Sequence, residues 1–556
     1  KEYYLYPHSR GWGREAMVTK SDRPDGPFVP VNLTPDGHKC VEGSILGFDP
    51  SIYVEQITDP SDPDYDKGFR AYGYWGFQRS SAAQLDQNTM YSVRPGTEVI
   101  PYFMPAGTPE GGVREPAGTE YPCLYPGEDP GAYRFFEASS IRRIGNKYVT
   151  IYSGYSGPEY GVGNSNSTLR YAYADTPLGP WKSGGVLVDS RGPVPNADGS
   201  AMTTSNGGHN THGSIEEING QWYVFYHRPP RGFGGARQAA VAPISVKWDK
   251  KPVAKGGQVE ICAFDPYAKN GGFITKDKAG HEYHGAEITS EGFHVYGLDP
   301  YNYYTAGIAC YLSDTGLQQD AWDVWNDHAT VGTLKNGDVV GYKYFGFGGL
   351  KNDALGIKAF EGICPGCHTA LNLFLQPRTD KEFKVAVWLD GPWSNDTWHG
   401  TKLGEITVPA GASKGTGRYK LDVADVVDKL DKKHAVYLVA EGPAGEGLFD
   451  LIGLGFSADG KDIEAPAVPH VAIAVNGEQL VLPELPVRST NENGIADNTV
   501  YRVSYSPSVP LRALKITPSA DNDEVQIYPP EIDFDHRKAT VKFEYHGQVK
   551  TYEILL

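Results

Sequence analysis

The sequence predicts an all-β protein. Its 556 residues include 67 glycines, 41 prolines and 36 tyrosines, but only four methionines. Glycine and proline favour turns, and aromatic residues favour strands, so this composition suits many short strands joined by turns. One segment, residues 423–430 (VADVVDKL), has a helical pattern, and it is too short to change the fold class.

Tyrosine-rich strands recur along the first half of the chain. Their markers are spaced by 69, 76 and 75 residues and are Tyr3, Tyr72, Tyr148 and Tyr223. A repeat of this length fits four-stranded propeller blades with long loops. A second repeat, SDRPDGPF at 21–28 and ADTPLGPW at 174–181, supports it, although a chain rich in glycine and proline could contain two such turns by chance.

The pattern changes after about residue 263 to denser short strands, and a proline-rich stretch (EAPAVPHV) follows near residue 465. We therefore predict three domains, a β-propeller over 1–265, a second domain over 266–460 and a third over 465–556. Alternation alone predicts a small immunoglobulin-like β-sandwich for the last one, and such a fold says nothing about what it binds.

Charge and composition exclude several classes of function. Acidic residues outnumber basic ones by 68 to 51, so the overall field repels a nucleic-acid backbone. No apolar run approaches the roughly 18 residues of a membrane span. Among six cysteines only Cys364 and Cys367 are close, without the βαβ context of a redox site or the second pair of a zinc site. A local disulfide and free thiols both stay open.

Two acids occupy comparable places in consecutive repeats. Asp49 (FDPSI) and Glu137 (FFEASSI) each lie just before or at the start of a strand, between apolar residues. An isolated acid of this kind is more often a cap or a solvated residue. Because the innermost strand of each blade lines a propeller's axis, acids at equivalent positions converge there, and such carboxylates can cleave a glycosidic bond.

His212 opens the third comparable unit (HNTHGSI), and Arg237 lies with the strand that follows. A lone histidine is usually a satisfied structural residue. His212 occupies the position in its repeat that Asp49 and Glu137 occupy in theirs. The competing hypothesis is therefore a role in the pocket or at a metal.

At these residues the chain resembles glycoside hydrolase family 43. The matching text is FDPSIYVE, FFEASSIRRIGNKYVTIYS, the two turns and HGSIEEINGQWYVFYHRP. The resemblance covers 1–265 and implies a five-bladed propeller that hydrolyses arabinosides, xylosides or galactofuranosides with inversion. It implies that Glu137 is the general acid. Asp49 then corresponds to the aspartate that orients the acid and modulates its pKa, and His212 to the axial histidine that supports a water-coordinated calcium ion.

The resemblance leaves the general base without a residue. In the family this base is an aspartate of the first blade, whereas EYYLYPHSRGWGREAMVTKSDRPDGPF matches the second. We therefore expect the first blade and the base before Lys1, or else an altered mechanism. Retaining fructosidase-like propellers are the nearest enzyme rival, but they favour Arg-Asp-Pro and Glu-Cys where this chain has Phe-Asp-Pro and Glu-Ala.

The middle block, over residues 285–457, resembles family 6 carbohydrate-binding modules, which are jelly-roll β-sandwiches. Trp393 and Trp398 in the loop DGPWSNDTWHG could stack on sugar rings, and ordinary loop packing is the equal alternative. Glu287 and Asp450 match positions where such modules hold a structural calcium ion.

These observations predict an exported, inverting exo-glycoside hydrolase that releases terminal furanosyl groups from plant or microbial polysaccharide. We place α-L-arabinofuranosides first and β-D-galactofuranosides second, and infer exo action from the long loops at 56–67 and 154–167. The alternatives are a β-xylosidase of the same family and a non-catalytic carbohydrate-binding propeller. We expect no cofactor for the chemistry beyond a structural calcium ion, and the sequence does not indicate an oligomeric state.

Overall fold

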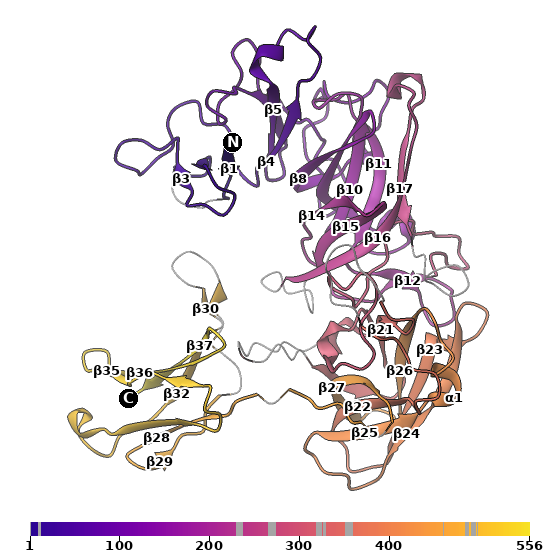
Figure 1. Ribbon diagram of the computed structural model, residues 1–556, viewed down its shortest axis with the longest axis vertical. Coiled ribbons are helices and arrows are strands. Elements are labelled where there is room, and N and C mark those ends of the chain that lie inside the picture. The colour runs from indigo at the N-terminus through magenta and orange to yellow at the C-terminus, as the bar shows by residue number, and fades with distance from the viewer. Residues whose placement is uncertain are drawn as a thin grey trace.

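The computed structural model consists almost wholly of β-sheets, which confirms the all-β prediction (Figure 1). Within its described residues the only α-helix is α1 (Ala424–Val427), one turn inside the segment expected to be helical. The structure describes residues 2–8, 13–228, 237–264, 274–317, 325, 330–350, 360–459, 461–466, 468–483, 487, 489–490, 496–497 and 499–556.

The first half of the chain forms successive antiparallel sheets, each built from strands in chain order. A three-stranded sheet comes first, with β1 (Tyr3–Leu5), β2 (Thr19–Ser21) and β3 (Val29–Pro30). The next has β4 (Ser51–Gln56), β5 (Phe69–Trp75), β6 (Ser81–Leu85) and β7 (Ile100–Pro101). The third has β8 (Phe135–Ile144), β9 (Lys147–Ser156), β10 (Ser165–Ala174) and β11 (Lys182–Asp189). The fourth has β14 (Gly213–Ile218), β15 (Gln221–Arg228), β16 (Gln238–Trp248) and β17 (Val259–Ala263).

Both sequence repeats recur as structure. The tyrosine markers lie in β1, β5, β9 and β15, and the last three are the second strands of their sheets. The two Pro-x-Gly-Pro turns join β2 to β3 and β10 to β11, which are the last two strands of their sheets. All ten residues of β9 are buried, as expected for an aromatic-rich strand covered on both faces.

The hairpin of β12 (Pro193–Pro195) and β13 (Met202–Thr204) leads from the third sheet to the fourth. Ala286 forms an isolated β-bridge with Val188 of β11. Ala286 and Ile288 both lie in the core that the third and fourth sheets share. The core of the third and fourth sheets therefore includes residues that follow position 265.

Two five-stranded sheets of the middle block enclose one apolar core. One sheet contains β18 (Tyr304–Thr305), β20 (Val331–Lys335), β22 (Ala370–Pro377), β25 (Gly417–Asp422) and β27 (Gly447–Ser457). The other contains β19 (Tyr311–Leu312), β21 (Val339–Gly346), β23 (Phe383–Ser394), β24 (His399–Val408) and β26 (Lys433–Glu441). Cys364 and Cys367 form a disulfide, whereas the other four cysteines, all described, are free.

The C-terminal block, yellow in Figure 1, has its own core. Its strands are β28 (Val471–Val475), β29 (Glu478–Gln479), β30 (Ser489–Thr490), β31 (Ala496–Asp497), β32 (Val500–Ser504), β33 (Ile516–Ala520), β34 (Gln526–Ile527), β35 (Glu531–Asp533), β36 (Lys538–Tyr545) and β37 (Gln548–Leu555). Trp325 of the middle block contacts this core, and its indole N–H donates to the Gln548 carbonyl at 2.9 Å.

Short 3-10 helices occupy several of the connections. They are η1 (Tyr65–Lys67), η2 (Pro130–Ala132), η3 (Pro158–Tyr160), η5 (Val253–Lys255), η6 (Ala306–Ile308), η7 (Thr315–Leu317) and η8 (Leu511–Ala513). In the part of the chain that the structure describes, no helix has the length and apolar character needed to cross a membrane.

Candidate active site

The first strands of three consecutive sheets bring three polar side chains together. Asp49 lies two residues before β4, Glu137 is the third residue of β8, and His212 immediately precedes β14. Strand β8 lies beside both β4 and β14. One side-chain ligand atom from each of the three residues lies within 4.8 Å of the other two. The convergence expected from the repeat is therefore present.

The backbone departs from regular strand geometry at both acids. Asp49 has a φ of 47° and Ala138, next to Glu137, a φ of 55°, both in the left-handed region. The pairing of β8 with β9 also shifts register on either side of Glu137. Such bulges re-aim a side chain at the end of a strand, and left-handed backbone costs roughly 1–3 kcal/mol at a residue other than glycine. These positions hold the acids where a straight strand would not.

The Glu137 side chain is only 3% exposed, and one of its carboxylate oxygens contacts two neighbouring side chains. Oε1 accepts a hydrogen bond from the Asn210 amide and lies 2.6 Å from His212 Nε2. The Arg237 guanidinium lies 3.4 Å from His212 Nδ1 and can only donate. His212 Nδ1 is therefore the acceptor, and Nε2–H donates to Oε1. This leaves Oε2 as the Glu137 oxygen that can carry a proton.

His227, on β15, is hydrogen-bonded to the backbone of His212. Its Nε2 accepts from the His212 backbone N–H at 3.0 Å and from Arg237 at 3.1 Å. Burial, the Arg237 charge and the neighbouring histidines His212 and His209 lower the pKa of His227 to about 3. His227 is therefore neutral at physiological pH and acts as an acceptor toward His212.

This shift predicts how stability depends on pH. Because the unfolded chain binds a proton near pH 6.5 and the folded one only near pH 3, acidification between these values should destabilise the fold. The contribution is at most about 1.4 kcal/mol per pH unit. Urea unfolding at pH 7, 6, 5 and 4 should show a shallower loss in His227→Gln than in wild type. His536→Gln, at an 80% exposed side chain, is the control, and equal slopes for all three proteins would refute this account.

Asp49 has a different environment from Glu137. Its Oδ1 lies 3.3 Å from His8 Nδ1, and its Oδ2 is buried without a hydrogen-bond partner among the described residues. Burial raises the pKa of Asp49, and the nearby Glu137 charge raises it further, against the opposing effects of His212, His8 and Arg237. The two acids are thus electrostatically coupled.

Aromatic rings surround the acids. Phe48 and Phe136, the chain neighbours of Asp49 and Glu137, both contact Phe77, with ring centroids 5.0 and 5.2 Å away. Phe77 is 46% exposed. The rings lower the local dielectric around the carboxylates, and Phe77 offers an apolar surface beside them.

The sequence of this chain is similar to the sequences of known proteins. No protein-family model matches the chain. A xylosidase/arabinosidase of Thermoclostridium stercorarium is 29% identical over 252 residues, which cover 42% of this chain and 44% of that protein. A beta-xylosidase of Xylanibacter ruminicola is 28% identical over 220 residues, covering 38% and 56%. The chain is similar to xylosidases and arabinosidases. It spans about half the length of these curated relatives.

Among solved structures, a glycoside hydrolase family 43 arabinoxylan arabinofuranohydrolase from Bacillus subtilis is 17% identical. The match covers 82% of this chain and 76% of that one, with a TM-score of 0.34. A TM-score this low does not establish a shared fold.

The residues expected at calcium sites have protein partners in the structure. Asp49, Glu137 and His212 form a group of potential metal ligands, and both ring nitrogens of His212 also face protein groups, one of them the Arg237 cation. Glu287 bonds the Lys343 ammonium at 3.0 Å and the Tyr344 hydroxyl at 2.6 Å.

Asp450 gives the same result. Its carboxylate is paired with Arg378 and accepts from the Thr333 hydroxyl at 2.9 Å. Each of these two acids already has a protein cation as its partner, and calcium at Glu287 and Asp450 stays a prediction.

Trp398 is buried against the loop between β12 and β13, which favours the loop-packing alternative for this residue. This side chain is only 4% exposed, and its indole N–H donates to the Asn196 carbonyl at 3.1 Å, in the loop between β12 and β13. Trp393 packs edge-on against Trp398 with ring centroids 5.5 Å apart. Trp398 therefore packs in the contact between the middle block and the hairpin loop, with Trp393 beside it.

Sequence reasoning missed Asn210, His227 and His8. Asn210 also accepts from the Ser153 hydroxyl at 3.0 Å, which ties it to β9. A usable pattern existed for His227, because it lies next to the end of β15, the tyrosine strand that pairs with β14. Nothing in the sequence links His8 to Asp49, which lies 41 residues away.

Proposed function

We propose that this chain is a glycoside hydrolase acting on xylosides or arabinosides, with Glu137 as its general acid. The observation that carries the proposal is the buried Glu137 carboxylate, whose Oε1 is held by His212 and Asn210 beside the Asp49 carboxylate. The similarity to xylosidases and arabinosidases supports the substrate class.

In this proposal the Glu137 Oε2 proton passes to the glycosidic oxygen as the bond to the leaving group breaks. An inverting pair needs carboxyl groups about 6.5–9.5 Å apart to admit the attacking water. Atoms of Asp49 and Glu137 lie within 4.8 Å, which is too close for Asp49 to be that base. We assign Asp49 to orienting the acid, and assign no base among the described residues.

The finer features remain part of the proposal. The candidate sugars are terminal α-L-arabinofuranosyl, β-D-galactofuranosyl and β-D-xylopyranosyl groups. We also propose that the protein is exported and that its fold is a five-bladed propeller followed by two β-sandwiches. Exo action rests on the connections 57–68 and 157–164, and the second is shorter than expected because β9 and β10 extend into it.

A carbohydrate-binding protein without turnover is the second candidate, because the site has an acid and no assigned base. Initial rates on 4-nitrophenyl α-L-arabinofuranoside, β-D-galactofuranoside and β-D-xylopyranoside separate the two. We expect release of nitrophenol from at least one of them, and proton NMR of the fresh product should show the inverted anomer. Calorimetric binding of the sugar without any release would favour the second candidate.

Asp49→Asn should alter the pH dependence of the reaction. Removing the negative charge beside the acid should move the alkaline limb of the kcat/KM profile to lower pH. The exposed Asp25→Asn, paired with Arg23 on the surface, is the matched control. If the limb of Asp49→Asn coincides with that of wild type, Asp49 does not act on the acid electrostatically.

A further inference from the structure

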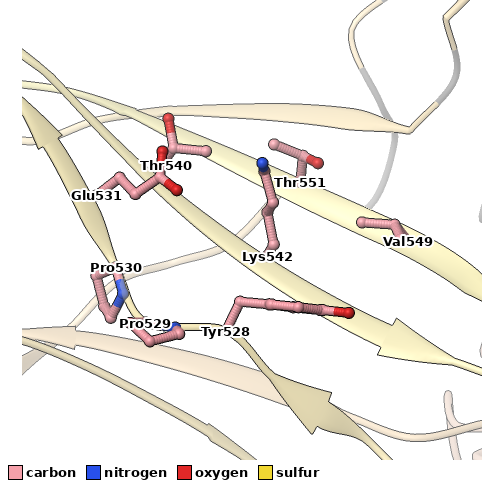
Figure 2. Close-up of a pocket in the computed structure, with 8 residues that line it drawn as sticks. All are labelled: Tyr528, Pro529, Pro530, Glu531, Thr540, Lys542, Val549 and Thr551. Atoms are coloured by element: carbon pink, nitrogen blue, oxygen red, sulfur yellow. The ribbon is translucent and has the colours of Figure 1, made fainter.

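A groove of about 580 Å³ opens on the C-terminal block (Figure 2). This volume lies within the roughly 300–1,000 Å³ that is usual for ligand pockets. Its lining combines apolar and hydrogen-bonding groups: Tyr528, Pro529, Pro530, Glu531, Thr540, Lys542, Val549 and Thr551.

An interruption in strand pairing creates the groove. Strands β34 and β35 both pair with β36, Ile527 opposite Phe543 and Glu531 opposite Thr540. Between these pairs, three residues (528–530) face only two (541–542). Because Pro529 and Pro530 have no N–H, the ladder cannot continue, and the segment bulges away from β36.

Strand alternation supplies the floor. Val541 and Phe543 of β36 point into the core, so Thr540 and Lys542 lie on the opposite face. On β37, Thr551 pairs with Lys542. Figure 2 shows Lys542 between Glu531 and Thr551, with the Tyr528 side chain extending toward Val549.

The polar groups of the groove are open to a ligand. Lys542 and Glu531 are exposed, and neither forms an ion pair with another described residue. The Tyr528 ring is partly exposed and is held in place by its hydroxyl, which donates to Glu544 at 2.5 Å. A held aromatic ring, two proline rings and several hydrogen-bonding side chains match a ligand with apolar faces and many hydroxyl groups.

We propose that this groove binds a neutral oligosaccharide segment, with Tyr528 stacking on a sugar ring and Lys542 and Glu531 bonding its hydroxyls. The opposite charges of these two residues disfavour a ligand of either net sign. The choice of sugar rests on the proposed function, whereas the groove and its chemistry do not.

The test is affinity electrophoresis of the full chain in native gels containing neutral arabinoxylan or anionic polygalacturonate. All proteins carry Glu137→Gln, which prevents turnover from altering the gel. Arabinoxylan should retard the parent, and Tyr528→Ala should weaken this binding about threefold to tenfold. Lys542→Met should also weaken this binding. Because the Lys542 side chain is exposed, this second variant should fold even if Tyr528→Ala does not. Phe293→Ala and Lys515→Met, at exposed positions elsewhere, are the matched controls and should behave like the parent.

Three results would overturn the proposal: no retardation of the parent by arabinoxylan, equal retardation of the parent and both groove variants, or retardation by polygalacturonate alone. Aryl glycoside turnover, measured without Glu137→Gln, should be unchanged by Tyr528→Ala. If retardation depends on Tyr528 while no glycoside is hydrolysed, the groove proposal holds and the proposed catalytic function fails.

Discussion

Glu137→Gln should lower kcat/KM on oligosaccharide substrates by about 10²–10⁴-fold, because the amide cannot donate the proton that the leaving oxygen needs. The change keeps the size of the side chain, and its amide oxygen can still accept from Asn210 and His212 at the position of Oε1. Substrate binding should therefore persist. Steady-state kinetics on xylobiose and arabinobiose measure the effect.

Glu217→Gln provides the matched control for this change. Glu217 is exposed on β14, the strand that begins directly after His212, so the same substitution occurs near the site without touching the acid. Its rates should equal those of wild type. A loss in Glu217→Gln as large as that in Glu137→Gln would show that the fold of this sheet, rather than proton donation, had been damaged.

Arg191→Met should destabilise the fold by about 3–5 kcal/mol, since it leaves a buried carboxylate without its cation. Asp189 is fully buried, and Arg191 Nε and Nη2 bond its two oxygens at 3.0 and 2.6 Å. The Arg191 carbonyl also accepts from the backbone N–H groups of Ser205 and Asn206, at the start of the segment that leads to Asn210 and His212. Urea unfolding at pH 7 measures the loss.

Arg23→Met tests whether burial is the cause of that loss. Arg23 and Asp25 form a close ion pair whose side chains are each 64% exposed, and such surface pairs contribute about 0–1 kcal/mol. The double variant Arg191→Met with Asp189→Leu should regain part of the stability, because it removes both buried charges. If Arg23→Met and Arg191→Met cost the same, the buried pair does not hold this segment.

The sequence was most informative where a repeat fixed the position of a residue. The spacing of Tyr72, Tyr148 and Tyr223 predicted one recurring strand per repeat, and the structure shows that it is the second strand of each four-stranded sheet. Asp49 and Glu137 then had to lie at the start of neighbouring first strands, so their convergence could be expected without a structure. All of this depends on local pattern and periodicity, which a single sequence contains.

Contacts between distant segments could not be predicted in the same way. Glu287 meets Lys343 56 residues further on, and Trp398 meets Asn196 across 202 residues. A carboxylate expected to bind calcium and one paired with a lysine have the same sequence pattern. The sequence of a loop also does not show whether a tryptophan in that loop is exposed or buried. Only the packing of the middle block on the rest of the chain distinguishes them.

The most direct test of general acid catalysis by Glu137 uses a series of aryl xylosides and arabinosides whose leaving groups increase in pKa. The quantity to measure is the ratio of kcat/KM for Glu137→Gln to kcat/KM for wild type on each substrate. An activated leaving group departs with little protonation and should be partly spared, whereas a poor one depends on the proton. The account predicts that the loss grows steadily with the pKa of the leaving phenol. An equal loss across the whole series would contradict it and assign Glu137 to substrate binding.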